Sequence, residues 1–469
     1  MFLRDEDTNG FPERPAGSAA AKSYIPAGFW TWPAYFLLFL MLAFPMVLSL
    51  LYVKAFLFGL LLLFVAVRGF MRLNLHLHLT VVVWTLALAC VSLFFCLRGM
   101  FLGTPGSVQC LQVYAIWPLI YLFLLGGVDK IGPLKGLEKT LFISTVFIGL
   151  FGVVYSFSQL GILPGIPYLE ASFSADELGI GTFDGYARLN FPGLNSFPFL
   201  APFFMAALAV RWFDQGSKWV TRLWMSVALL LVLMVVLVSG RRALQLVTLL
   251  APLLTLGLGS LRPAGERTQL KRSLRQMAII FLLAVVILVP LLGPIYSIDF
   301  AGIAERFSSG FDFSPTSFDD SPDARRQQYF ALMNGWHEHP LIGAGLGASA
   351  YGSIRSEAMP WAYELYYLDL LFQTGVFGFL AYTAGILWIY WTGIKIIRRG
   401  GSDCQMIIPL LVGMSGLLMA SATNPYLARF DGIWVIFLPL ALINHWLLQS
   451  GDSFEHRKRK AQVSLACET

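Results

Sequence analysis

The chain has 469 residues, of which 57% are hydrophobic and only 13% are charged. A soluble chain of this length would carry a larger charged fraction, so the composition excludes an ordinary soluble protein and predicts a polytopic membrane protein. Although the formal net charge is +6, the positions of charges in a membrane chain matter more than their sum, and we expect no nucleic-acid partner.

Apolar stretches of roughly twenty residues are long enough to cross a bilayer as helices. They predict an all-α fold class with about twelve spans in a single integral membrane domain, residues 1–469. The expected spans lie near 31–51, 54–71, 79–97, 113–128, 140–160, 191–212, 219–238, 243–260, 277–296, 365–392, 405–424 and 432–449. The opening MFLRDEDTNG has no short apolar region with a cleavage site, so we expect the first span to stay as an anchor.

The lysines and arginines are concentrated in alternate loops, which fixes the expected orientation. Such loops usually face the cytoplasm, so both termini and the basic loop 262–275 are expected there. Two long loops, about 161–190 and about 297–364, then fall on the outer side, and loops of this length are usually functional. The five cysteines lack metal-ligand spacing and predict neither a disulfide framework nor a zinc site.

The polar stretch SPDARRQQYFALMNGWHEHPLIGAGLG, residues 321–347, stands out within the second loop. Ser321–Asp323 forms a typical helix start, with a hydroxyl cap, a proline and an acid in the first turn. The helix should run to about His337, because Pro340 disfavours helical geometry at the residue before it. The glycines at 343–347 allow a sharp bend, so we expect His339 at a helix exit beside a glycine elbow.

Two adjacent arginines, Arg241 and Arg242, lie in a very short turn on the outer side, where positive charge is disfavoured. One interpretation is that they reach toward lipid headgroups. The other is an anion site formed with Arg188 and Arg325 of the long loops, because guanidinium groups bind phosphate oxygens through paired hydrogen bonds.

Of the six histidines, only His337 and His339 fall outside. A general base that works near neutral pH is most often a histidine, and the helix-exit setting favours His339 over a purely structural role. A metal site formed by both histidines and Glu338 is disfavoured, because alternate residues at a helix end point apart. Three nearby acids could hold a divalent cation or simply form a solvated loop: Asp319, Asp320 and Asp323.

Several motifs together resemble the O-antigen ligase and polymerase superfamily. HPLIGAGLG, with Arg325 fourteen residues before His339 and Tyr329 four residues after that arginine, resembles the outer-loop signature of this family. VSGRRALQL resembles its Ser-Arg-Gly-Ala turn between two spans, with the family arginine at Arg241.

Two further segments extend the resemblance over residues 186–380. RLNFPGLNSFPFLA resembles the family segment that runs from an arginine to an asparagine, here Arg188 and Asn195. YELYYLDLLFQTGVFG resembles a segment that usually carries a histidine and a glutamate. In this chain Glu364 and Gln373 stand at those positions.

The resemblance implies transfer of a glycan from an undecaprenyl-pyrophosphate donor to lipid A–core, at the periplasmic face of the bacterial inner membrane. Arg241 and Arg188 would stabilise the pyrophosphate leaving group, and His339 would deprotonate the acceptor hydroxyl, with inversion at the sugar. No metal or other cofactor is needed for this chemistry. Arg242, Arg325, Asn195, His337 and Tyr329 are the expected substrate-binding residues.

Arg325 presents a geometric difficulty, because fourteen residues of unbroken helix would place it roughly 20 Å from His339. Alternatives within the same superfamily are an O-antigen polymerase and a protein O-oligosaccharyltransferase, which differ in the acceptor. A lipid-linked oligosaccharide flippase or other transporter is an alternative of a different class. A transporter is expected to carry charges near the middle of its spans, and here only Asp369, near an outer end, breaks the apolar pattern.

Overall fold

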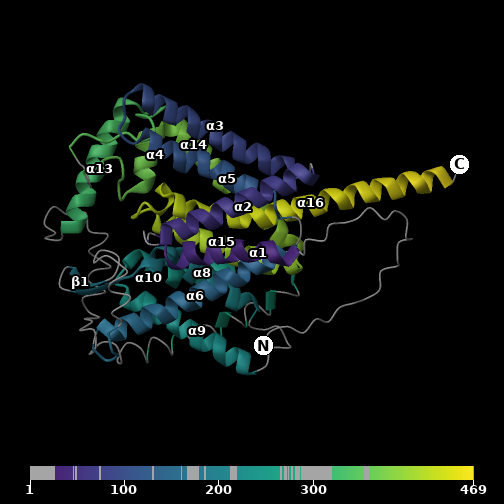
Figure 1. Ribbon diagram of the computed structural model, residues 1–469, viewed down its shortest axis with the longest axis horizontal. Coiled ribbons are helices and arrows are strands. Elements are labelled where there is room, and N and C mark those ends of the chain that lie inside the picture. The colour runs from purple at the N-terminus through teal and green to yellow at the C-terminus, as the bar shows by residue number, and fades with distance from the viewer. Residues whose placement is uncertain are drawn as a thin grey trace.

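The fold was analysed in a computed structural model of the chain (Figure 1). It describes residues 27–45, 47, 50–72, 75–128, 131–159, 161–165, 179–183, 186–211, 219–264, scattered positions from 267 to 286, and 320–352, 357 and 359–467. Within these ranges eight helices are long and apolar enough to cross a membrane, and three shorter ones are also apolar. They support a polytopic membrane protein. Each expected span overlies such a helix except 277–296, most of which lies outside the described residues.

The described helices follow the apolar runs of the sequence, and an antiparallel hairpin in the loop 161–190 adds two strands to the expected all-helical class. The elements are α1 Ala27–Ala43, α2 Leu51–Arg72, α3 Leu79–Phe101, α4 Ser107–Leu111, the π-helix η2 Gln112–Ile116, α5 Trp117–Leu125, α6 Ile131–Gln159, β1 Gly179–Phe183, β2 Tyr186–Asn190, η3 Pro192–Ser196, α8 Phe197–Arg211, α9 Trp219–Val238, α10 Arg242–Gly259, α13 Asp320–Glu338, α14 Tyr366–Arg399, α15 Ser402–Ala420, η4 Tyr426–Ala428 and α16 Phe430–Cys467.

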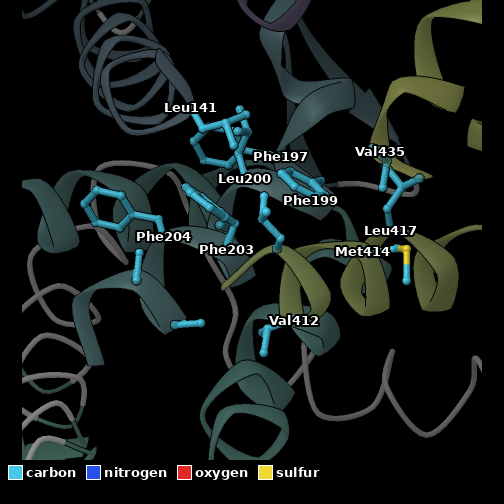
Figure 2. Packing of buried hydrophobic residues seen from close by; sticks show 14 of the residues in the cluster. Leu141, Phe197, Phe199, Leu200, Phe203, Phe204, Val412, Met414, Leu417 and Val435 are labelled. Carbon is cyan, nitrogen blue, oxygen red and sulfur yellow. The ribbon is translucent and has the colours of Figure 1, made fainter. Parts of the chain in front are cut away.

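Helix α8 lies at the centre of the bundle and packs against α15, α10 and α6. Its sequence FPFLAPFFMAALAVR is apolar on all sides, which is typical of a helix surrounded by protein. Figure 2 shows Phe197, Phe199 and Leu200 of α8 beside Leu141 of α6 and Val435 of α16. All five side chains are fully buried.

Two glycines allow α15 to approach α8 closely. A Cβ at Gly413 would lie 2.9 Å from the ring of Phe199, and a Cβ at Gly416 would overlap the carbonyl oxygen of Pro198. Helices inside a membrane associate mainly through such close packing, because lipid chains are as apolar as leucine. The contact between α8 and α15 therefore depends on the missing side chains at these two positions.

We expect Gly416→Ala to destabilise the protein by roughly 1–3 kcal/mol, because the added methyl group would push α15 away from α8. The measurement is the melting temperature of the purified protein in detergent. Gly257→Ala is the matched control: it also lies in a membrane helix, α10, but a Cβ there meets no atom within 4 Å. Equal melting temperatures for the two variants would contradict the proposed packing.

Candidate functional site

The residues expected to carry the chemistry lie at one end of the helical bundle. Figure 1 shows α13 and strand β1 at this end. Arg188 lies in β2, Asn195 in η3, Arg241 at the N-cap of α10, and His339 directly after α13. Segments far apart in the sequence therefore supply one face of the molecule.

Arg241 joins three of these segments through its side chain. Its Nη1 donates to Oδ1 of Asn195 at 2.8 Å, and its Nη2 donates to Oδ1 of Asn190 at 2.9 Å. Both partners are neutral amides, and together they orient the guanidinium group. Asn195 was expected from the sequence, whereas Asn190, the last residue of β2, was not.

The backbone around Arg241 forms the short turn that the sequence predicts between two spans. Gly240 has a positive φ of 63°, and the backbone N–H of Arg241 donates to Oγ of Ser239 at 3.3 Å. Arg241 is half-buried, and its carbonyl oxygen accepts the hydrogen bond from Gln245 within the first turn of α10. The guanidinium group thus lies beside the N-terminal end of a long helix, where the helix dipole favours bound anions.

The neighbouring arginines take separate positions. Arg242 is the first residue of α10 and is half-buried, whereas the hydrogen bonds to Asn190 and Asn195 are made by Arg241. Arg188 pairs with Gly181 across the hairpin, but its side chain lies outside what the structure describes.

Helix α13, Asp320–Glu338, confirms the helix predicted over about 321–337. Nε of Arg325 donates to Oε2 of Glu364 at 2.8 Å, and the backbone N–H of Glu364 donates to Oε1 of Gln328 at 2.9 Å. Because α13 is unbroken, it keeps Arg325 and His339 apart, as the helix spacing implies. Glu364 therefore serves as the partner of Arg325.

The remaining expected residues on this helix are accessible. Tyr329 and His337 are exposed, and the ring of His337 lies 5.1 Å from that of Trp336. The side chain of His339 is also exposed, and its carbonyl oxygen accepts a hydrogen bond from Gly343 at 2.9 Å. His339 thus lies at a helix exit that leads into a tight turn, as expected.

The segment 340–347, which we call the elbow, is tied to α14 by backbone hydrogen bonds. Val376 and Phe377 donate to the carbonyl oxygens of Pro340 and Leu341 at 2.9 and 3.1 Å, and Gly345 donates to that of Gln373 at 2.9 Å. Gly375, with φ 63° and ψ −172°, breaks the helical geometry of α14 at this point. At the kink, backbone N–H and carbonyl groups of α14 form hydrogen bonds with the elbow, so the two backbones cross in direct contact.

Glycines are required on both sides of this crossing. Gly343, Gly345 and Gly347 all have positive φ angles. A Cβ on Gly343 would overlap the backbone of Gln373, one on Gly345 would lie 2.6 Å from the Cα of Gly99, and one on Gly347 would overlap the backbone of Gly106. The glycines of the GAGLG motif therefore allow the elbow to pack closely against α14, α3 and α4.

Two polar side chains for which the sequence predicted no role form hydrogen bonds with the backbone of the elbow: Gln373 and Arg98. Oε1 of Gln373 accepts from the backbone N–H of Gly347 at 2.8 Å, and its Nε2 donates to Oδ1 of Asp369 at 2.6 Å. Nε of Arg98, at the end of α3, donates to the carbonyl oxygen of Gly343 at 3.0 Å. The spacing of Asp369 and Gln373 by four residues in a helix was the available signal for the first pair.

Among the described residues, no group of three or more histidine, cysteine, aspartate or glutamate side chains could hold a metal ion. Asp320 and Asp323 lie in the first turns of α13, and Asp319 lies outside the described residues.

We expect Gln373→Glu to destabilise the protein by roughly 1–3 kcal/mol, because it replaces the amide donor by an oxygen that faces both Asp369 and the carbonyl of Trp361. The double variant Asp369→Asn/Gln373→Glu reverses the direction of the hydrogen bond and retains one carboxylate, so its melting temperature should recover in part. Asp369→Asn alone is the control, since its amide oxygen still accepts from Gln373. A double variant no more stable than Gln373→Glu would contradict the assigned hydrogen bonds.

Comparison with known proteins does not assign a family. No model of a known protein family matches the chain, and no curated protein does. The function is accordingly inferred from the contacts of Arg241, the α13 helix and the elbow, together with the motif resemblance.

Proposed function

We propose that this protein is a glycosyltransferase that moves a glycan from undecaprenyl pyrophosphate to lipid A–core in the bacterial inner membrane. In this proposal the end of the bundle that carries α13 faces the periplasm, and both termini are cytoplasmic. The observation that supports it most is the arginine Arg241, held by Asn190 and Asn195 at the same end as the exposed His339.

The pyrophosphate of the donor would bind at Arg241. When the bond between the sugar and the pyrophosphate breaks, the bonding electrons leave with the carrier, and the added negative charge must be stabilised. A guanidinium group that is already oriented by two amides loses little freedom on binding phosphate, and the N-terminal end of α10 adds a favourable dipole. Arg188, two residues before Asn190 in β2, would supply a second cation.

The acceptor hydroxyl would attack the anomeric carbon from the opposite side, which inverts its configuration. As the new bond between oxygen and carbon forms, the hydroxyl proton would pass to the imidazole of His339. An exposed imidazole at a helix exit is accessible to an acceptor from solvent or from the membrane surface.

The exposed residues Tyr329 and His337 would contact the acceptor along α13, with Arg325 available for its anionic groups in competition with Glu364. A polymerase or a protein O-oligosaccharyltransferase would use the same donor chemistry with another acceptor. A transporter is less well supported, because Asp369, the one acid noted near the end of a span, is engaged by Gln373.

The proposed role of Arg241 predicts that Arg241→Ala reduces transfer by on the order of a hundredfold, or roughly 3 kcal/mol of transition-state stabilisation. Arg241→Lys should restore little, because lysine retains the charge but loses the planar fork that also binds the two asparagines. The assay combines the purified protein, carrier-linked glycan and lipid A–core, with EDTA and without nucleotide.

Arg399→Ala is the matched control for the arginine, because Arg399 lies at the opposite end of α14 and contacts Trp446 and Ser450. Wild-type transfer by Arg241→Lys would exclude paired recognition of the phosphate. Transfer only to a carrier-linked or a peptide acceptor would instead identify the polymerase or the protein-directed alternative.

His339→Ala should abolish transfer and leave donor binding intact, because a general base acts in the transition state and not in the ground state. His337→Ala should have the milder effect, since His337 still belongs to α13 and precedes the elbow. The measurement is donor affinity alongside single-turnover rate. If His339→Ala loses donor affinity but transfers normally at saturating donor, the histidine positions the ligand and another group accepts the proton.

A further inference from the structure

Two consecutive aliphatic side chains of the elbow project away from the protein. Leu341 is 57% and Ile342 is 38% exposed, although the glycines that follow are buried. Exposed apolar side chains that adjoin a larger apolar face mark a surface that contacts something other than water. The depth of the elbow in the bilayer indicates whether this surface contacts lipid.

Helix α14 gives a first measure of this depth. Lys395, whose ammonium group lies 5.6 Å from the ring centroid of Trp391, marks the end of its apolar part on the side away from α13. About twenty helical residues cross the hydrocarbon core of a bilayer, and counting back from Lys395 ends at the kink, Gly375. The next two residues donate to the carbonyl oxygens of Pro340 and Leu341, so the elbow lies at the boundary of the hydrocarbon.

Helix α3 gives a second, separate measure. It begins at Leu79 and runs in the opposite direction, and about twenty residues bring it to Arg98. Nε of Arg98 is bonded to the carbonyl oxygen of Gly343. Two helices counted from the far side of the membrane therefore place the elbow at the same level.

Both helices carry exposed apolar side chains close to their contacts with the elbow. Phe377 is 60% exposed on α14, next to the backbone contact with Leu341, and Phe101 is 91% exposed at the end of α3. In helices that cross a membrane, such exposed apolar side chains lie against lipid chains. Leu341 and Ile342 add two more exposed apolar side chains beside those of the two helices.

We propose that the elbow inserts Leu341 and Ile342 into the outer edge of the hydrocarbon, so that this surface binds the acyl chains of membrane lipids. His339, two residues earlier, then lies at the level of the lipid headgroups. Burying these side chains in lipid is favourable because it removes apolar surface from water. The inference requires only that the protein spans a membrane and does not depend on glycan transfer.

The test replaces Leu341 with the photo-crosslinking residue p-benzoylphenylalanine in the full-length protein, reconstituted in phospholipid nanodiscs. After illumination, lipid adducts are quantified by mass spectrometry. Position 377 is the positive control. Asn334, an exposed polar residue of α13, is the matched control on the side of water. We expect adduct yields at 341 close to those at 377 and severalfold above those at 334.

Position 342 serves as a second site in case the substitution at 341 disturbs the fold. Yields at 341 and 342 no higher than at 334 would overturn the proposal, because both side chains would then face water. Crosslinks to the chain itself from both positions would also overturn it, since they would place the side chains against protein.

Discussion

The crossing of the elbow over the kink of α14 is the constraint on which this end of the molecule depends. The backbones of the elbow and of α14 are hydrogen-bonded to each other and leave no space for a Cβ between them. Gly343 and Gly375 must therefore both be glycine. The same crossing anchors the exit of α13, the end of α3 and the start of α4 to one another. A shift of the elbow would therefore move His339 together with all of these elements.

The two groups of polar residues depend on different parts of the fold. Arg241 is held by a short turn between two helices and by amides from β2 and η3, none of which involves the elbow. His339 depends on the elbow and on α13. Separate supports of this kind would position the proposed donor and acceptor sites independently of each other.

Several contacts at this end involve residues to which the pattern of the sequence assigned no partner. Asn190 resembles any asparagine at the end of a strand, Arg98 resembles any arginine at the end of a span, and Gln373 lies within an apolar helix. Each acquires its role from a partner far away in the sequence: Arg241, Gly343 and Gly347. Such partners cannot be inferred from local periodicity, because hydrogen bonds between distant segments leave no mark on it.

The sequence alone determined the membrane class, the position of nearly every apolar helix, the helix over about 321–337 and the bend after His339, because these follow from local composition, capping and glycine content. It also singled out Arg241 and Asn195 as members of one site through their motifs. The tertiary structure decided that Asn190 completes this site, that Arg325 is engaged by Glu364, and that the glycines serve a backbone crossing. These features depend on which helices lie side by side, and burial of similar apolar faces does not specify that arrangement from local sequence.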